Sequence, residues 1–484
     1  MARGYVAGMP RRHLSVRVRD DALARELATG FAQIRAELEI PEAFPAAVLA
    51  EAQRAVADPP TPAEDLTELP FLTIDPPGST DLDQAMHLER RDGGYRLRYA
   101  IADVGGFVPP GGAIDREANR RGQTLYSPDT RTPLHPPVLS EGAASLLPGE
   151  VRPAVVWTFE LGADGRQRAV DVRRALVRSR DRLDYAGVQA ALDGGTTDER
   201  LVLLAEIGEV REALEVERGG VSLPLPEQQI EQVDGTFRLA YRANLPVEGF
   251  NEQVSLLTGM AAAQLMLEAG VGVLRTLPPA GSDAIALLRR AADGLGIDWP
   301  DGRSYAEVIA GVDATDPRSA AFFEEATTLL RGAGYTSFDG SPPELKVHAA
   351  VAASYAHATA PLRRLVDRYV SEVCLAVSAG TEVPDWVREA LPALPERMAE
   401  SDRIAGALER ECLGLMEATV LRDSIGSTFD GVVVEVHEKG GGTVQLADPA
   451  VRAGFDGQLP LGQKVTVRLV EADVGKRSVR FAPA

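Results

Sequence analysis

Two stretches near the start of the chain carry apolar residues at intervals of three and four, the spacing that gives a helix one apolar face. They cover residues 20–38 and 45–56, and prolines follow at positions 59, 60 and 62. Because proline breaks helices, these prolines indicate a linker. The pattern predicts a short helical module over residues 1–65. A helix-turn-helix and a packing appendage with no nucleic-acid role are both open.

From residue 66 the pattern changes to short apolar or alternating runs, which are typical of strands. Such runs predict strands at 71–74, 96–101, 155–160 and 169–179, the last two joined as an antiparallel pair. Longer segments with helical spacing follow and predict helices at 198–217, 250–269, 283–294, 317–333 and 394–422. Strands followed by helices favour an α+β fold. We therefore expect one mixed domain over residues 66–424.

The last 60 residues change character again, to short alternating strands separated by glycine-containing turns. Runs at 428–436, 465–469 and 478–481 alternate apolar and polar residues, and turns at 440–442, 460–462 and 475–476 separate them. Five strands within this length suit an OB-fold β-barrel. We expect such a barrel over residues 425–484.

Candidate chemistry is concentrated where the strand predicted at 71–74 ends. Asp75 follows that strand, and Pro-Pro-Gly-Ser then forces a turn that can bring Asp81 and Asp83 back toward it. Clustered carboxylates repel one another unless a positive charge lies between them. Mg²⁺ and Mn²⁺ prefer oxygen ligands and are the simplest such charge. An acidic surface turn with Asx caps is the alternative interpretation.

The same stretch, Ile74 to Gln84, resembles the motif I-D-x-x-x-x-x-D-x-D-D of the RNB-type exoribonucleases, the family of ribonuclease II and ribonuclease R. Further blocks resemble the family in the same order: Ile101-Ala102-Asp103, Gly122 to Pro128, Pro133 to Pro136, Arg182 to Tyr185, a helix headed by Glu252, and Thr359-Ala360-Pro361-Leu362-Arg363-Arg364. Several ordered matches are far more specific than any one short motif. The family also carries an RNA-binding OB domain after its catalytic core, where this chain has its predicted barrel.

The resemblance implies a role for each matched residue. It implies that Asp75, Asp81, Asp83 and Gln84 hold Mg²⁺ or Mn²⁺, with two ions during catalysis, and that Asp81, Asp83 and Arg363 act in the chemistry. It implies RNA contacts by Tyr126, Tyr185, Glu252 and Arg364. Two divalent ions about 3.5–4 Å apart can activate water and stabilise the leaving oxygen.

Residue 84 departs from the family motif, which has aspartate where this chain has glutamine. An amide oxygen can ligate a metal ion but brings no negative charge. Gln84 therefore leaves two outcomes open: a weakened metal site in an active enzyme, or a protein without catalysis.

Composition changes this interpretation only in part. The chain has 51 basic and 71 acidic residues, a net charge of −20, which disfavours a protein that coats nucleic acid over its whole surface. RNA binding confined to a channel remains compatible with that charge, because the local field decides. The two cysteines, Cys374 and Cys412, lack metal-ligand spacing, and we expect no disulfide. No apolar run is long enough to span a membrane.

These observations predict a metal-dependent, processive 3′-to-5′ exoribonuclease, cytoplasmic and monomeric, that hydrolyses single-stranded RNA to nucleoside 5′-monophosphates. A non-catalytic RNA-binding member of the family is the first alternative. A metal phosphohydrolase acting on small molecules is the second, and the predicted RNA-binding barrel argues against it.

Overall fold

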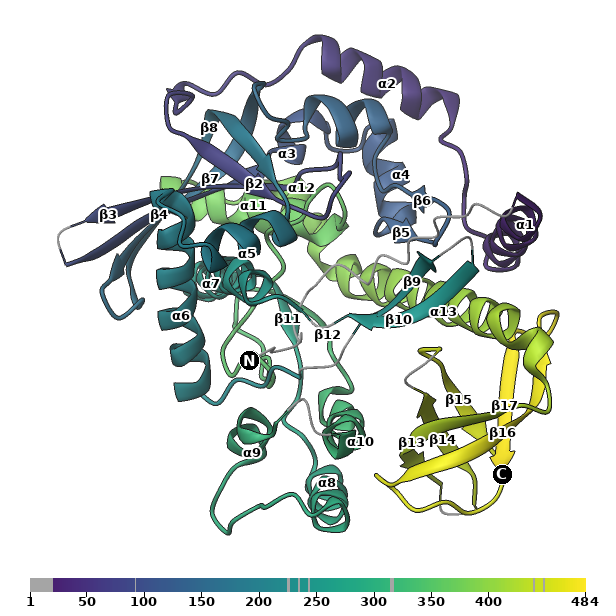
Figure 1. Cartoon of the computed structure of the whole chain (residues 1–484). Helices are drawn as coiled ribbons and strands as arrows, with labels where there is room; N and C mark the ends of the chain where they lie inside the picture. The colour runs from purple at the N-terminus through teal and green to yellow at the C-terminus, as the bar shows by residue number, and fades with distance from the viewer. Residues whose placement is uncertain are drawn as a thin grey trace.

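The computed structural model describes residues 21–484, apart from Asp92 and residues 224–226, 234–235, 243, 314–316, 438–439 and 447–448. It shows a mixed helix-and-sheet body joined by a long helix, α13 (Leu394–Leu421), to a small closed barrel at the C-terminus (Figure 1). The α+β fold with a C-terminal barrel is therefore as expected.

The two N-terminal helices form nearly where the apolar spacing places them, as α1 (Asp21–Glu37) and α2 (Ala46–Ala57). They pack on different parts of the protein. Phe31 and Ile34 of α1 are buried in one cluster with α13 and the barrel. Val48 and Ala52 of α2 are buried in another, with the central sheet, and α2 packs on α4 (Ala113–Arg121). The described part of the expected 1–65 module thus joins two separate cores, and residues 1–20 lie outside the described residues.

The central sheet has the strand order β1-β8-β2-β3-β4-β7, with a further pairing of β7 to β8. The long strand β8 pairs antiparallel with β7, as predicted, and in parallel with the short β2. Trp157 and Phe159 of β7 and Tyr99 of β4 are completely buried in the core beside the sheet. The strands are β1 (Glu64–Asp65), β2 (Phe71–Ile74), β3 (Gln84–Arg91), β4 (Gly94–Ala102), β7 (Val151–Gly162) and β8 (Gln167–Leu183).

Helices dominate after the sheet, as the periodicity predicts. The predicted helix at 317–333 is shorter than expected, because α10 (Pro317–Ala326) gives way to a 3₁₀ turn, η2 (Thr327–Leu330). The longer helices are α5 (Tyr185–Asp193), α6 (Glu199–Glu217), α7 (Pro246–Ala269), α8 (Ser282–Leu295) and α11 (Leu365–Ala379). Short elements complete the body: α3 (Val104–Phe107), the hairpin β5 (Leu125–Tyr126) and β6 (Arg131–Thr132), the π-helix η1 (Leu139–Ala143), β9 (Glu227–Val233), β10 (Thr236–Arg242), β11 (Val271–Thr276), α9 (Tyr305–Gly311), β12 (Gly334–Asp339), α12 (Asp385–Ala390), η3 (Leu391–Ala393) and η4 (Arg422–Ser424).

The barrel closes in the order β13-β14-β15-β17-β16, with five strands as expected of an OB fold. Phe455 and Phe481 are buried inside it, and α13 and α1 contribute to the same cluster. The strands are β13 (Thr428–Val436), β14 (Gly442–Leu446), β15 (Arg452–Phe455), β16 (Lys464–Asp473) and β17 (Ser478–Pro483).

The sequence predicts neither a disulfide nor a membrane-spanning segment, and the structure describes both cysteines. Cys374 and Cys412 are both free and buried. Among the described residues, no helix combines the length and the apolar character that crossing a membrane requires.

A buried ion pair fixes α11, the helix that follows the Thr359–Arg364 loop. Arg368 is 2% exposed, and its Nη1 lies 2.6 Å from Oδ1 of Asp115 on α4. Its Nη2 donates to the carbonyl of Val108 at 2.8 Å, and its guanidinium lies 4.7 Å from the ring centroid of Trp386. Removing one partner of such a pair leaves a buried charge uncompensated.

We therefore expect Asp115→Ala to lower the free energy of unfolding by about 3–5 kcal/mol, the usual effect of breaking a buried pair. Urea denaturation of the full chain measures this value. The matched control is Arg116→Ala, at the exposed next position, which should change it by less than about 0.5 kcal/mol. Equal effects of the two variants would contradict a stabilising role for the Arg368–Asp115 pair.

Candidate active site

The acidic turn forms as the sequence predicts. Strand β2 ends at Ile74, Asp75 follows, and Gly78 adopts a φ of +86°, a left-handed conformation that glycine reaches without strain. Ser145 holds the returning chain, because its Oγ accepts from the Leu82 amide at 2.9 Å and donates to the Thr80 carbonyl at 2.8 Å. Strand β3 then begins at Gln84.

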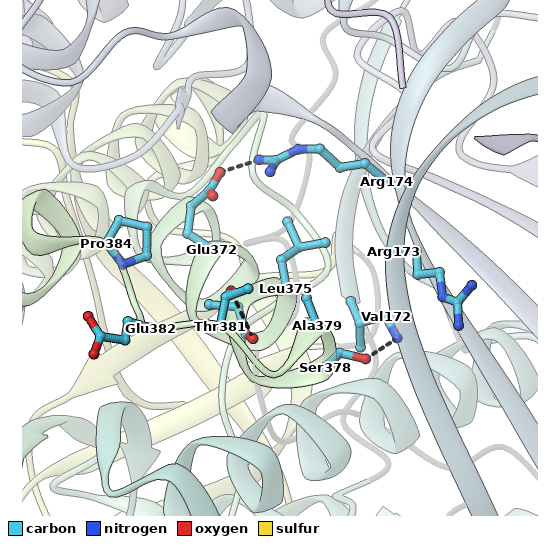
Figure 2. Close-up of a pocket in the computed structure, with 11 residues that line it drawn as sticks. Val172, Arg173, Arg174, Glu372, Leu375, Ser378, Ala379, Thr381, Glu382 and Pro384 are labelled. Carbon is cyan, nitrogen blue, oxygen red and sulfur yellow. Dashed lines mark hydrogen bonds and ion pairs between the residues drawn. The ribbon is translucent and has the colours of Figure 1, made fainter. Parts of the chain in front are cut away.

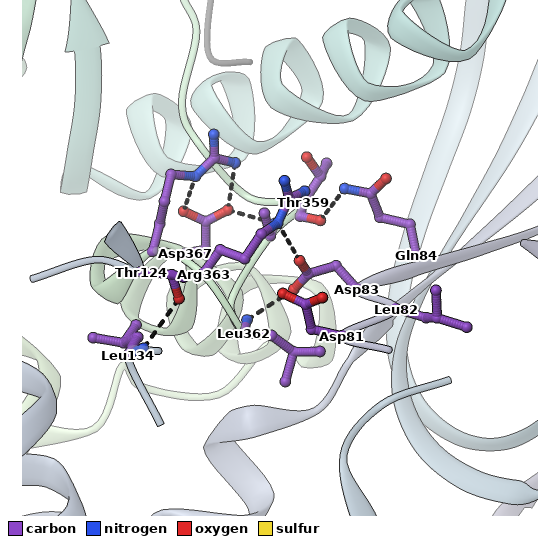
Figure 3. A network of polar contacts seen from close by, with 12 residues as sticks. Asp81, Leu82, Asp83, Gln84, Thr124, Leu134, Thr359, Leu362, Arg363 and Asp367 are labelled. Atoms are coloured by element: carbon purple, nitrogen blue, oxygen red, sulfur yellow. Dashed lines mark hydrogen bonds and ion pairs between the residues drawn. The ribbon is translucent and has the colours of Figure 1, made fainter. Parts of the chain in front are cut away.

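Asp83 connects this turn to a segment 280 residues later in the chain (Figure 3). Its carboxylate is buried, and Oδ1 accepts a hydrogen bond from the Leu362 amide at 2.8 Å. Oδ2 accepts from Nε of Arg363 at 2.6 Å. Burial raises the pKa of Asp83 to about 6, because the Arg363 charge and the Leu362 amide only partly offset desolvation. The two catalytic residues predicted from different motifs, Asp83 and Arg363, are thus in direct contact.

Asp75 and Asp81 lie in the same electrostatic neighbourhood. Burial, opposed by the Arg363 charge and helped by the charges of Asp83 and Asp81, raises the pKa of Asp75 to about 7. Asp81 has a partner of its own, because Nη1 of Arg131 lies 2.6 Å from its Oδ1. The three carboxylates therefore influence one another, although two of them are paired with arginines.

Gln84 uses both ends of its amide for hydrogen bonds. Its Nε2 donates to the Thr359 carbonyl at 2.5 Å, and its Oε1 accepts from the Tyr99 hydroxyl at 3.0 Å. The Tyr99 hydroxyl also lies 3.0 Å from Oγ of Ser255 on α7. Gln84 consequently links β3, β4, α7 and the Thr359–Arg364 loop, and its oxygen already has a donor.

The side-chain oxygens of the acidic turn suit a divalent ion by their chemistry but not by their arrangement. Three carboxylates and an amide are the hard oxygen ligands that Mg²⁺ and Mn²⁺ prefer, and like charge remains around Asp75. The arrangement does not fit the expected two-ion site. Among the described residues, no three acidic, histidine or cysteine side chains come close enough together to hold an ion. Asp81 and Asp83 instead face Arg131 and Arg363.

The predicted RNA-contacting residues fall into two groups. Tyr126, at the end of β5, is influenced by Arg363, Asp81 and Asp83, and burial raises its pKa. Tyr185, the first residue of α5, accepts from Nδ2 of Asn251 at 3.1 Å and is influenced by Asp75. Both tyrosines therefore lie near the acidic turn.

Glu252 and Arg364 have their main contacts elsewhere. Oε1 of Glu252 is buried without a hydrogen-bond partner in the described part of the chain, and burial next to Glu215 and Glu212 raises its pKa well above the ordinary value. Arg364 donates to both carboxylate oxygens of Asp367, at 2.9 and 2.8 Å. Asp367 also accepts from the Ala360 amide at 2.7 Å, so Arg364 helps to shape its own loop. Its contact with RNA stays a prediction.

Sequence reasoning missed three contributors: Tyr99, Ser255 and Arg131. Tyr99 lies in the alternating run 96–101, where its position indicates only a core residue. Ser255 lies on α7, one turn beyond Asn251, with no motif around it. Arg131 stands five residues after Tyr126, between the matched blocks 122–128 and 133–136, and this position was the only signal for it.

A hollow of about 630 Å³ between β8 and α11 shares no lining residue with the acidic turn (Figure 2). Three of its charged groups, Arg173, Arg174 and Glu372, are already paired. Arg174 binds Glu372 and, at 2.8 Å, Asp103, while Arg173 lies 2.7 Å from Asp171. Both arginines of the hollow therefore have acidic partners, and the acidic turn stays the candidate site.

Comparison with known proteins gives two family matches. Residues 63–378 match the RNB domain, and residues 427–484 match the RNase II-type exonuclease C-terminal S1 domain. The matched segments leave out α1 and α2 at one end and α12 and all of α13 between them. The domain boundaries expected at 65 and 424 stay predictions.

Individual relatives agree with these matches. The chain is 29% identical to ribonuclease R of Escherichia coli over 436 residues, which cover 82% of this chain and 52% of that protein. It thus spans about half the length of the curated relatives it matches. The structure of Mycoplasma genitalium RNase R in complex with ribose-methylated single-stranded RNA superposes with a TM-score of 0.85 at 19% identity, covering 95% of this chain and 78% of that one.

A second similar structure is that of yeast Ssd1, described as a pseudonuclease, with a TM-score of 0.65 at 17% identity, covering 84% of this chain and 53% of the other. At such identities the structural likeness shows the fold alone. The family match covers well over half of the residues, from the acidic turn through the Thr359–Arg364 loop. The chain therefore belongs to the RNB family and carries an RNase II-type S1 domain at its C-terminus.

Proposed function

We propose that this chain is a divalent-metal-dependent, processive 3′-to-5′ exoribonuclease that degrades single-stranded RNA to nucleoside 5′-monophosphates. The observation that carries the proposal is the contact of Asp83 with Arg363 and with the Leu362 amide. This contact supports the proposal because it brings the acidic turn next to an arginine that could bind a phosphate, in a chain of the RNB family. Similarity to an RNase R structure with bound single-stranded RNA supports the choice of substrate.

The residues take the following roles in this proposal. Arg363 presents a planar guanidinium to the scissile phosphate, a group that it can bind through paired hydrogen bonds. Tyr126 and Tyr185 stack on bases near the RNA end, which suits an enzyme without sequence preference. Glu252, with its raised pKa, is held protonated and can donate a hydrogen bond to the terminal nucleotide. Arg364 shapes the Thr359–Arg364 loop and contacts the RNA beside that loop.

A divalent ion, when bound, would supply Lewis-acid stabilisation of phosphoryl charge and a water molecule of lowered pKa. Asp75, Asp81 and Asp83 are the residues of this chain with the charge to attract it. The arginine and tyrosine side chains described above bind and orient the RNA end and hold it next to these carboxylates. Metal dependence is typical of RNB-family nucleases, and the identity of the ion stays a prediction, as do the cytoplasmic location and the monomeric state.

A binding-only role is the second candidate, and one observation favours it. The amide of Gln84 is committed to Thr359 and Tyr99, where the family motif has a carboxylate. A related fold is described as a pseudonuclease, that of yeast Ssd1. The small-molecule phosphohydrolase is disfavoured, because such an enzyme has no use for an S1 domain.

The decisive experiment follows a 5′-labelled single-stranded RNA on a gel, with Mg²⁺ and then with Mn²⁺. We expect a ladder of products in millimolar Mg²⁺ and a faster reaction in Mn²⁺, which is less strongly hydrated. Gln84→Asp restores a negative charge and should lower the metal concentration required for half the maximal rate. The binding-only role would be established if the natural chain cleaves RNA with neither ion and the Gln84→Asp variant does cleave it.

Asp83→Asn should abolish the ladder while RNA affinity changes by less than about tenfold, because the variant removes charge from the chemistry and few contacts from the RNA path. Fluorescence anisotropy with the same RNA measures the affinity. Asp171→Asn is the control, since it removes a carboxylate from an exposed ion pair on β8. A parallel loss of binding and cleavage in Asp83→Asn would contradict its catalytic role.

The raised pKa of Asp75 predicts a stability change with pH in the metal-free protein. Its folded pKa is about 7, against about 4 in an unfolded chain, so the folded state binds the proton more tightly. The contribution of Asp75 to stability is therefore fully present below pH 4 and is lost as pH rises from about 4 to 7.

Thermal unfolding in EDTA tests this sign. As pH rises from 4 to 7, the Tm of the natural chain should fall relative to that of Asp75→Asn, which cannot ionise. Mg²⁺ should raise the Tm of the natural chain at pH 8 more than that of the variant. Melting temperatures that run parallel across this range would show that Asp75 is not held in a buried, negatively charged neighbourhood.

A further inference from the structure

Arg131 makes three polar contacts, two with the acidic turn and one with the π-helix η1. Its Nη1 lies 2.6 Å from Oδ1 of Asp81. Its Nη2 donates to Oγ1 of Thr80 at 2.6 Å and lies 2.8 Å from Oε2 of Glu141. Arg131 belongs to the short strand β6, whereas Glu141 lies in the π-helix η1. The guanidinium is therefore held in place from the acidic turn on one side and from η1 on the other.

These contacts hold the positive charge of Arg131 in one position beside Asp81. The side chain of Arg131 is 28% exposed and that of Asp81 is 13% exposed, so solvent screens the pair only in part. Thr80 also donates from Oγ1 to Glu141 at 3.2 Å, which closes the network. A rigid, planar cation with several directional contacts is pre-organised in a way that a lysine is not. Short hydrogen bonds between charged groups are also the stronger ones.

The balance of charge at the site differs from that of a two-ion centre. Asp81 and Asp83 each have a guanidinium at 2.6 Å, one from Arg131 and the other from Arg363. Gln84 adds no charge, and its oxygen accepts from Tyr99. Of the three carboxylates, only Asp75 has no hydrogen bond or ion pair to its side chain in the described part of the chain.

Two divalent ions about 3.5–4 Å apart repel each other four times as strongly as two single charges would, so they need several unpaired carboxylates around them. This chain supplies one such carboxylate and a fixed cation instead. We propose that Arg131 is a resident cation of the active site that takes the place of a second divalent ion, so that the chain binds one ion rather than two. The inference rests on the metal dependence proposed above and deepens it.

Direct counting of bound Mn²⁺ tests the inference on the full chain without RNA. Titration calorimetry gives the stoichiometry and affinity, and electron paramagnetic resonance of free Mn²⁺ gives an independent count. We expect one Mn²⁺ per natural chain. Arg131→Gln removes the resident charge, and it should bind Mn²⁺ at least tenfold more tightly or take up a second ion. Arg131→Lys keeps the charge and should still bind one.

The matched control is Arg173→Gln, which removes an arginine from an exposed ion pair on β8 and should leave both stoichiometry and affinity unchanged. The number of Mn²⁺ ions bound by the natural chain tests the inference even if Arg131→Gln is unstable. The Tm of each variant shows which variants are folded. Two ions in the natural chain would overturn the inference and leave the proposed activity intact. Unchanged Mn²⁺ binding in folded Arg131→Gln would also overturn it. No Mn²⁺ bound to any variant, with RNA cleavage in EDTA, would overturn the metal requirement itself.

Discussion

The contact between Asp83 and the Leu362–Arg363 segment is the constraint on which the site depends. A carboxylate that is 2% exposed cannot stay charged without partners, because desolvation would otherwise dominate. Its two oxygens are satisfied by one backbone amide and one guanidinium, which together fix the position and the orientation of the loop. The site is therefore assembled by the same interaction that stabilises the buried charge.

The rest of the frame keeps that loop in place. Gln84 holds its beginning through the Thr359 carbonyl, and Asp367 holds its middle through the Ala360 amide and Arg364 (Figure 3). The helix that follows, α11, is tied to α4 by the buried Arg368–Asp115 pair. The polar groups that shape the loop thus have partners both close by, at Asp367, and far away in the chain, at Asp83 and Gln84, which is how an irregular segment can be rigid.

Charge is distributed unevenly between the site and the whole molecule. The chain carries a net charge of −20, yet the guanidinium groups of Arg131 and Arg363 pair with two carboxylates of the acidic turn. An anionic polymer is therefore offered positive charge at one place and repelled over much of the surface, which favours binding of an RNA end in the site over coating. The same two arginines reduce the negative charge that is available to divalent ions.

Sequence alone determined the elements and the chemistry that are local. Apolar spacing located α1, α2, α6 and α13 almost to the residue. Apolar or alternating runs located β2, β4, β7 and β8 of the sheet and β13, β16 and β17 of the barrel, but not β1, β3, β14 or β15. These patterns succeed because residues close together in the sequence decide which face of a helix or strand is buried. Ordered motifs likewise identified the acidic turn and the Thr359–Arg364 loop, and the RNB and S1 matches confirm the family. A helix extended to residue 333 was wrong, because helical spacing does not reveal where α10 tightens into a 3₁₀ turn.

Only the tertiary structure decided which partner each charged group takes. Spacing suggested that Asp81 and Asp83 share one metal site, but each binds a different arginine from a distant segment. Gln84 was expected to face a metal ion, whereas its amide joins Thr359 to Tyr99. Arg131 was not singled out, since its place between two matched blocks does not indicate that β6 lies beside the acidic turn. Such pairings depend on contacts across 50 to 280 residues, and a pattern read along the chain contains no information about them.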